Sequence, residues 1–134
     1  MKLYTTDGNF IKETDDYPTN YTGMIEDQWG NQRWYLNAIS HRDNNLPAII
    51  LKNGTTEWRV NGRLHRTDGP AMDREDGYKE WFVDGKRHRI DGPACEDSNG
   101  IKVWFFDDKK VTEEACKLLC DMLKLKSNKN GEIK

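Results

Sequence analysis

Long apolar runs, an excess of charge of one sign and paired cysteines are all missing from this 134-residue chain. No segment approaches the roughly 20 apolar residues of a membrane-spanning helix. The first residues lack the apolar stretch of a signal peptide, so we expect a cytoplasmic protein that does not bind membranes. The formal net charge of −2 excludes the strong basic excess of general nucleic-acid binders and leaves open a locally basic face.

Cysteine is scarce and odd in number, since Cys95, Cys116 and Cys120 are the three present. No Cys-x-x-Cys pair and no fourth ligand accompanies them, as a structural zinc site would require. We therefore expect reduced thiols that pack as small apolar side chains, and we predict no metal and no other cofactor.

What the chain does have is an internal repeat, marked by tryptophan at intervals of 24, 23 and 23 residues: Trp34, Trp58, Trp81 and Trp104. A glycine stands four residues before each tryptophan, and in the last three units it is Gly54, Gly77 or Gly100. A His-Arg pair follows seven residues after each of the first three tryptophans. A period of this length is typical of an array of similar supersecondary units.

Each unit holds two turn signals between segments rich in Trp, Phe, Val and Tyr. Asn61-Gly62 and Asp84-Gly85 mark one turn, and Asn53-Gly54, Asp76-Gly77 and Asn99-Gly100 mark the other. Such pairs accept the positive φ angles of type I′ hairpins. A unit of about 23 residues is too short for a strand–helix–strand crossover. The prediction is a mainly β fold, with residues 29–110 forming a repetitive antiparallel β-hairpin sheet.

Alternation along the strands sorts the side chains into two faces. We expect the tryptophan face to be the inner one, with its rings stacked along the sheet. The opposite positions form a second stripe: Tyr35, Arg59, Phe82 and Phe105. Aromatic residues beside arginine are typical of interface anchors, so this stripe is a candidate partner-binding face. The alternative is a second buried face, covered by the N-terminal segment or by a helix.

The two ends of the chain depart from the repeat. Residues 1–28 are expected to form an N-terminal cap. Thr112 can cap a helix over 111–126, whose apolar residues recur at helical spacing: Ala115, Leu118, Leu119, Met122 and Leu123. We expect this amphipathic helix to cover the last strand with that stripe, and we expect 127–134 to be a flexible tail.

The His-Arg pairs suggest three kinds of chemistry. Equivalent histidines two strands apart lie about 10 Å from each other, too far to share a metal ion. Phosphate binding by Arg42, Arg66 and Arg89 would make the protein a nucleic-acid or nucleotide binder, which is the alternative function. Each arginine is, however, followed two residues later by Asn44, Asp68 or Asp91, which favours structural pairs at a turn. His65 and His88 are likewise predicted to be structural. No nucleophile elbow, phosphate loop or carboxylate pair supports an enzyme.

The pattern Trp-x-x-(Asn/Asp)-Gly-(Arg/Lys)-x-His, continued by Arg-x-Asp-Gly-Pro-Ala, resembles the MORN repeat, and in particular a variant common in bacteriophage proteins. The resemblance covers residues 29–110, strongly in two units and partly in the first and fourth. It implies a hairpin array that acts as a non-enzymatic scaffold, dimerisation or protein-interaction surface. It further suggests a small phage accessory protein that inhibits a macromolecule in the host cytoplasm, for example a bacterial defence component (an anti-CRISPR candidate). A homodimer is also plausible.

Overall fold

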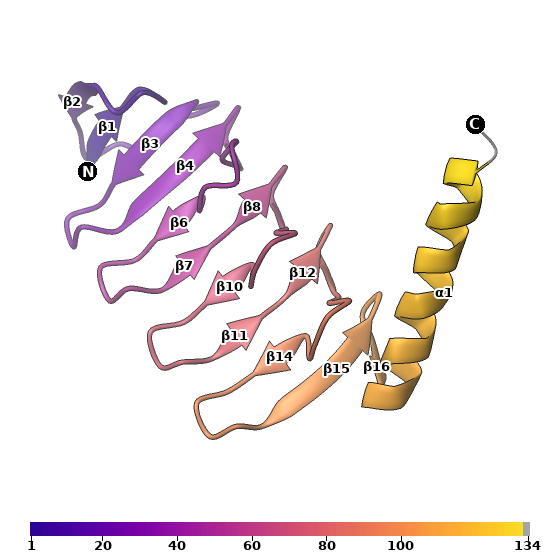
Figure 1. Ribbon diagram of the computed structural model, residues 1–134. Coiled ribbons are helices and arrows are strands. Elements are labelled where there is room, and N and C mark those ends of the chain that lie inside the picture. The colour runs from indigo at the N-terminus through magenta and orange to yellow at the C-terminus, as the bar shows by residue number, and fades with distance from the viewer. Residues whose placement is uncertain (133–134) are drawn as a thin grey trace.

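The computed structural model describes residues 1–132 of the chain, with one long antiparallel sheet and one C-terminal helix (Figure 1). The strands are β1 Lys2–Tyr4, β2 Phe10–Glu13, β3 Gly23–Glu26, β4 Gln32–Leu36, β5 Ile39–Ser40, β6 Ile49–Ile50, β7 Thr56–Glu57, β8 Arg59–Val60, β9 Arg63–Leu64, β10 Met72–Asp73, β11 Lys79–Glu80, β12 Phe82–Val83, β13 Lys86–Arg87, β14 Cys95–Glu96, β15 Lys102–Phe106 and β16 Lys109–Val111. The helix is α1, Glu113–Glu132. The predicted mainly β fold is confirmed.

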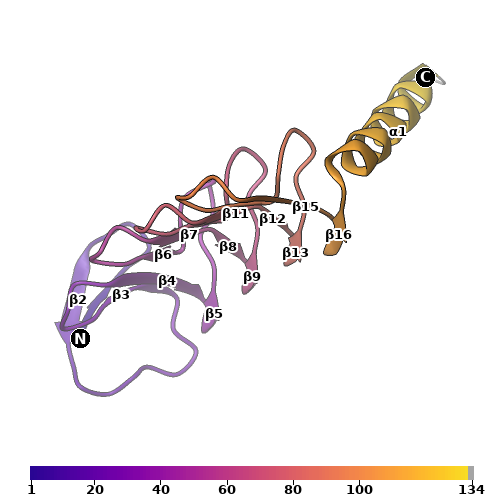
Figure 2. The ribbon, with the colours of Figure 1, turned by 90° about the horizontal axis from the view of Figure 1, so that it is seen from below.

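The main sheet has 12 strands in the order β16-β15-β14-β11-β10-β7-β6-β4-β3-β1-β2, with β5 paired to β4. Each repeat adds two strands to it. Beyond the tryptophan, the second arm bends into a short hairpin, which is β8-β9 in one unit and β12-β13 in the next. Seen from below, β5, β9, β13 and β16 descend one after another on the same side of the sheet (Figure 2).

The turns of the short hairpins are of type I′, as predicted. Asn61 and Gly62 have φ angles of 51° and 80°, and Asp84 and Gly85 repeat this pair of values closely. The turns of the long hairpins are different, because in Asn53-Gly54, Asp76-Gly77 and Asn99-Gly100 only the glycine has a positive φ. In the first of these the N–H of Gly54 donates to the carbonyl of Leu51, which closes a four-residue turn whose last residue is the left-handed glycine. The type I′ prediction was wrong for this class.

Both ends of the array are closed by extra elements. β1 and β2 form an N-terminal hairpin, whereas β3, which lies inside the expected 1–28 cap, pairs with both β1 and β4 and so starts the first long hairpin. At the other end Oγ1 of Thr112 accepts a hydrogen bond from the N–H of Ala115 at 3.1 Å, so Thr112 is the N-cap of α1. The helix continues past residue 126 into the segment expected as a tail, of which only residues 133–134 lie outside the described structure.

Both faces of the sheet contain buried side chains. All four repeat tryptophans lie on one face, the tryptophan face, where each is only half-buried, although Met24, Ala48, Ala71 and Ala94 on the same face are buried. The side chains buried on the opposite face, here called the aromatic face, are Leu3, Ile25, Glu80, Phe82 and Cys95. Phe82 is only 8% exposed, so it is not the exposed anchor that the alternation predicted.

A capped turn gives the first hairpin a pH dependence. Although burial raises the pKa of Asp27, hydrogen bonds from Asn31, Arg33 and the N–H of Trp29 outweigh it and lower that pKa from 3.8 to about 2. The carboxylate is therefore the stabilising form. Its contribution is complete above the unfolded pKa and is lost as the pH falls through the folded one.

Asp27→Asn is expected to lower the free energy of unfolding by about 1–2 kcal/mol at pH 7. The difference from the unmodified protein should shrink below about pH 4 and vanish only below about pH 2. Urea titrations at several pH values measure it, with exposed Asp15→Asn as the matched control. A penalty that stays constant over this range would contradict the assignment.

Candidate interaction surface

Three arginine loops cover the tryptophan face, at residues 42–47, 66–70 and 89–93. In each loop the guanidinium lies over the tryptophan of its own unit, with Cζ 3.8–3.9 Å from the ring centroid: Arg42 on Trp34, Arg66 on Trp58 and Arg89 on Trp81. A cation at this distance from an indole face is attracted by the ring quadrupole. The rings are therefore covered by arginine, and no tryptophan stacks on another within residues 1–132.

The Asp-Gly-Pro-Ala sequence is explained by the same guanidinium. Nε of Arg89 donates to Asp91 at 2.8 Å and Nη1 donates to the carbonyl of Pro93 at 3.1 Å. A Cβ on Gly92 would lie 2.7 Å from Cζ of Arg89, so a larger residue there would push the guanidinium aside. Ala94 follows, fully buried, and accepts the N–H of Trp81. The loop at 66–70 repeats these contacts with Arg66, Asp68, Gly69, Pro70 and Ala71.

The first arginine loop carries one additional residue but keeps the contact of the guanidinium with the proline carbonyl. Nη1 of Arg42 donates to the carbonyl of Pro47, and Asn44 and Asn45 both adopt positive φ. The amide of Asn45 reaches the next loop and donates to Asp68 at 2.6 Å. Hydrogen bonds from Arg66 and from Asn45 lower the pKa of Asp68. This loop is therefore linked directly to its neighbour.

The histidines join each unit to the next. Nδ1 of His65 accepts a hydrogen bond from the N–H of Asp84 at 3.0 Å, and His41 and His88 accept in the same way from Asn61 and Asp107. Each acceptor holds the type I′ turn of the following unit. The contact requires Nδ1 to be unprotonated, which places the proton of a neutral ring on Nε2. These histidines therefore act in the structure of the array.

Open clefts separate the loops along the tryptophan face. One between two loops has a volume of about 560 Å³ and is lined by Pro70, Trp81, Val83, His88 and Ile90 among others. Equivalent clefts of about 300 and 330 Å³ lie beside Trp58 and Trp34. Since each unit contributes two strands, successive clefts are about 10 Å apart.

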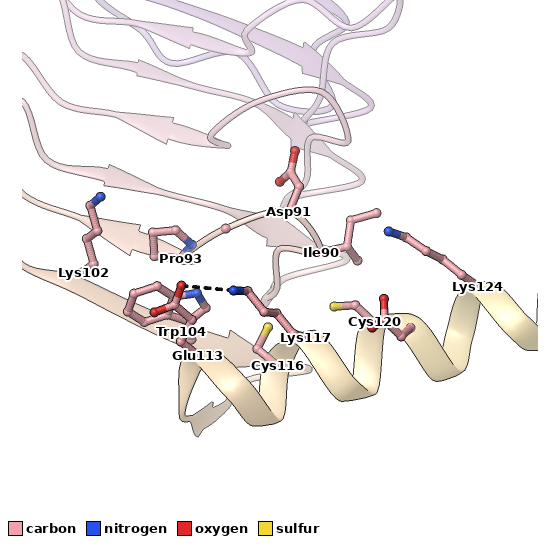
Figure 3. Close-up of a pocket in the computed structure, with 12 residues that line it drawn as sticks. Ile90, Asp91, Pro93, Lys102, Trp104, Glu113, Cys116, Lys117, Cys120 and Lys124 are labelled. Atoms are coloured by element: carbon pink, nitrogen blue, oxygen red, sulfur yellow. Dashed lines mark ion pairs between the residues drawn. The ribbon is translucent and has the colours of Figure 1, made fainter.

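The last cleft, of about 600 Å³, is closed by the helix in place of a fourth arginine loop (Figure 3). Trp104, Pro93 and Ile90 face Cys116 and Cys120 of α1 across it. Both cysteines are buried, and burial raises the pKa of Cys120 to about 11. Protonated thiols of this kind are poor nucleophiles, which agrees with a packing role.

The aromatic face is held together by an internal charge cluster. The buried carboxylate of Glu80 accepts from Nε of Arg87 at 2.8 Å and from the thiol of Cys95 at 3.7 Å. The guanidinium of Arg87 lies between the rings of Phe82 and Phe105. Burial beside Cys95 and Glu80 raises the pKa of Tyr78 to about 12. The carboxylate of Glu80 and the guanidinium of Arg87 therefore neutralise each other within the cluster.

Of the other stripe residues, Arg59 is bound to Glu57 at 2.8 Å and to the carbonyl of Gly62. Tyr35 is half-buried, and burial together with nearby Tyr17 raises its pKa. Tyr17 belongs to the loop between β2 and β3, so the N-terminal segment covers part of the stripe. The structure thus aligns Tyr35, Arg59, Phe82 and Phe105 on one face but leaves little of it free.

Helix α1 presents an unexpected side to solvent. It packs on β15 through Cys116 and Cys120, while most of the apolar stripe predicted to cover the last strand is exposed. Of the predicted stripe, Leu118 is 66% exposed, Met122 59% and Leu123 44%, whereas Ala115 and Leu119 are half-buried. Leu125, which was not part of that stripe, is 60% exposed. The predicted packing of this stripe was wrong, because the face with small thiols allows closer contact with Trp104 and with the carbonyl of Arg89.

Sequence reasoning also missed two exposed isoleucines. Ile90, 55% exposed, lines both large clefts of the tryptophan face. Ile101, 62% exposed, borders a smaller hollow beside Phe105 on the aromatic face. The signal for Ile90 was present, because the equivalent positions of the two earlier units are the polar residues Asp43 and Thr67.

Among the side chains that the structure describes within residues 1–132, no three from His, Cys, Asp or Glu gather as metal ligands would. In that same part of the chain, no helix combines the length and the apolar character needed to cross a bilayer. Comparison of the chain with protein-family models, with curated proteins and with solved structures finds no match.

Proposed function

We propose that this protein is a non-enzymatic protein-interaction module whose binding surface is the row of clefts on the tryptophan face. The observation that carries the proposal is the row of clefts beside the repeat tryptophans, which a repeat of two strands spaces about 10 Å apart along one face. Such a row suits an extended segment or an edge of a partner protein that places side chains into successive clefts. Their walls combine Trp, Pro, His and Arg, a composition that favours protein contacts.

The proposed role is that of a small phage accessory protein that binds and inhibits a host macromolecule, with a bacterial defence component as one such target. Support for the biological part is the resemblance of the repeat to the phage-type MORN variant. The mechanism would be steric: a rigid array, held by histidines and arginine loops, covers a surface that the target needs. No described residue has to react for this mechanism to operate.

The arrangement of the arginines argues against the alternative of nucleic-acid binding. Arg66 and Arg89 each donate to an aspartate and to a proline carbonyl of their own loop. The aspartates are the more exposed partners, at 58% for Asp68 and 78% for Asp91. The loop surface therefore presents carboxylates outward, where phosphate binding needs free cations.

Two matched substitutions test which face binds. Ile90→Asp places a charge in the clefts of the tryptophan face, and Ile101→Asp places one on the aromatic face at similar exposure. Affinity capture from bacterial lysate with mass spectrometry identifies the partner, with and without nuclease. We expect nuclease to have no effect, Ile90→Asp to weaken binding about tenfold or more, and Ile101→Asp to leave it unchanged.

The opposite pattern for the two variants would move the binding site to the aromatic face. Loss of capture after nuclease treatment would favour the nucleic-acid alternative. Circular dichroism of both variants serves as the folding control, because both side chains are exposed and their replacement should leave the sheet intact.

A further inference from the structure

We propose that the clefts of the tryptophan face bind a proline-rich, basic segment in the polyproline II conformation, with the cleft beside Trp81 as the main contact. The inference rests on the proposed function, because it uses the same row of clefts, and it adds the conformation and the chemistry of the partner segment. Three features carry it: the period of the clefts, an indole N–H without an acceptor, and exposed carboxylates on two walls of one cleft.

The period of the array selects the conformation of the segment. Two strands per unit place successive clefts about 9.6 Å apart. One turn of polyproline II takes three residues and rises about 9.3 Å, so every third side chain meets a cleft with a mismatch of about 1 Å over the whole row. A β-strand repeats its facing side chains about every 6.7 Å. Seven residues of α-helix rise about 10.5 Å, which accumulates a mismatch of about 3 Å.

The indole N–H of Trp81 supplies a donor for such a segment. In the preceding unit Nε1 of Trp58 donates across its cleft to the carbonyl of Asn45 at 3.3 Å, and Asn45 belongs to the longer first arginine loop. The loop at 66–70 is one residue shorter, and among the described atoms none accepts a hydrogen bond from Nε1 of Trp81, which is not buried. Because polyproline II makes no internal hydrogen bonds, one of its carbonyls can accept from this N–H.

The walls of the same cleft fit proline and basic residues. Pro70 and Ile90 add apolar surface beside the ring of Trp81. Asp68 and Asp91 come from the two loops on either side, and their side chains are 58% and 78% exposed, whereas the arginines that they bind are only 21% and 20% exposed. A lysine or arginine between two prolines would therefore meet carboxylates at the rim of the cleft.

Isothermal titration calorimetry of the full chain with three 12-residue peptides tests the inference. The peptide (Pro-Pro-Lys)4 is about 37 Å long as polyproline II, enough to reach all four clefts. We expect it to bind about tenfold or more tightly than (Gly-Gly-Lys)4, which keeps the charge without the conformation, and than (Pro-Pro-Glu)4, which keeps the conformation with the opposite charge. No binding of (Pro-Pro-Lys)4, or equal binding of either control peptide, would overturn the inference.

Two matched substitutions test the role of the indole N–H. Trp81→Phe keeps a ring under Arg89 and removes the donor, so the dissociation constant of (Pro-Pro-Lys)4 should rise about fivefold. Trp58→Phe removes an N–H that is already bonded within the protein and should leave the constant unchanged. Equal effects of the two variants would overturn the assignment of Trp81 as the main contact. Circular dichroism is the folding control.

A second variant keeps the test sharp if Trp81→Phe proves unstable. Ile90→Thr introduces at an exposed site the residue found at the equivalent position of the preceding unit, so the fold should tolerate it. It should raise the dissociation constant of (Pro-Pro-Lys)4 about threefold through lost apolar contact. Unchanged binding by Ile90→Thr would overturn the placement of the peptide in this cleft.

The outcomes separate this inference from the proposed function. A protein partner whose capture is weakened by Ile90→Asp, together with no binding of (Pro-Pro-Lys)4, would uphold the proposed function and overturn this inference alone. Capture that is insensitive to Ile90→Asp would instead overturn the proposed function, and this inference with it.

Discussion

Replacement of Phe82 by alanine is expected to lower the free energy of unfolding by about 3–5 kcal/mol, the range found for buried phenylalanines. Phe82 is the largest buried apolar side chain of the repeats, and Cζ of Arg87 lies 5.5 Å from the centroid of its ring. Its removal leaves a hole beside the Glu80 carboxylate and loosens the arginine that neutralises it. Urea denaturation followed by tryptophan fluorescence measures the loss.

Phe10→Ala is the matched control for this change. Phe10 lies on the edge strand β2 and is 59% exposed, so its replacement should cost much less. Equal losses for the two variants would show that the aromatic face of the repeats is not a core. Binding to a partner cannot explain a difference, because both measurements use the isolated protein.

Trp81→Ala is expected to cost about 3 kcal/mol, the low end for tryptophan because the ring is only half-buried. The ring supports the guanidinium of Arg89, which in turn holds Asp91 and Pro93. Arg89→Ala should therefore cost much less in a chain that already lacks Trp81. We expect a coupling free energy of about 1 kcal/mol from the double-mutant cycle.

The cycle needs a tryptophan other than the four repeat tryptophans for comparison. Trp29 lies in the turn between β3 and β4 and is 68% exposed, so Trp29→Ala should change the free energy of unfolding little. Strictly additive costs for Trp81→Ala and Arg89→Ala would mean that the arginine gains nothing from the ring. The cover of the tryptophan face would then depend on the loop contacts alone.

The repeat itself could be predicted because its signals are local. Asn-Gly and Asp-Gly pairs at fixed distances from tryptophan specify hairpins whatever surrounds them, and Thr112 specifies the start of a helix. The period then requires equivalent strands to lie side by side. Even here, the turns at Asn53-Gly54 and its equivalents differ from the prediction, because the same residue pair also fits the end of a longer turn.

Burial could not be predicted in the same way. Alternation shows that Trp81 and Phe82 point to opposite faces, but it does not say which face is covered. The answer depends on the return loop, where Arg89 folds over Trp81 and takes the place of a second layer. Strand alternation gives no information on this contact, because Arg89 lies in the loop that follows the strands.

The helix shows the same limit. Its apolar residues lie at helical spacing, and the usual expectation is that they face the protein. The thiols of Cys116 and Cys120 face it instead, because small side chains let the helix approach Trp104 and the loop of Arg89. Both the cysteine side and the wider Leu/Met side of α1 fit a contact with the sheet. The spacing of the residues alone does not show which side packs there.

Because each histidine holds the turn of the next unit, and each arginine closes a loop between neighbouring strands, no unit depends on the total number of units. Duplication of residues 72–94, one full period, would extend the sheet by two strands and reproduce every contact of the copied unit. Natural variation in this architecture is therefore expected in whole periods, with the two ends unchanged. The length of the surface that the protein lays along a target would then be set by the number of repeat units rather than by changes to individual surface residues.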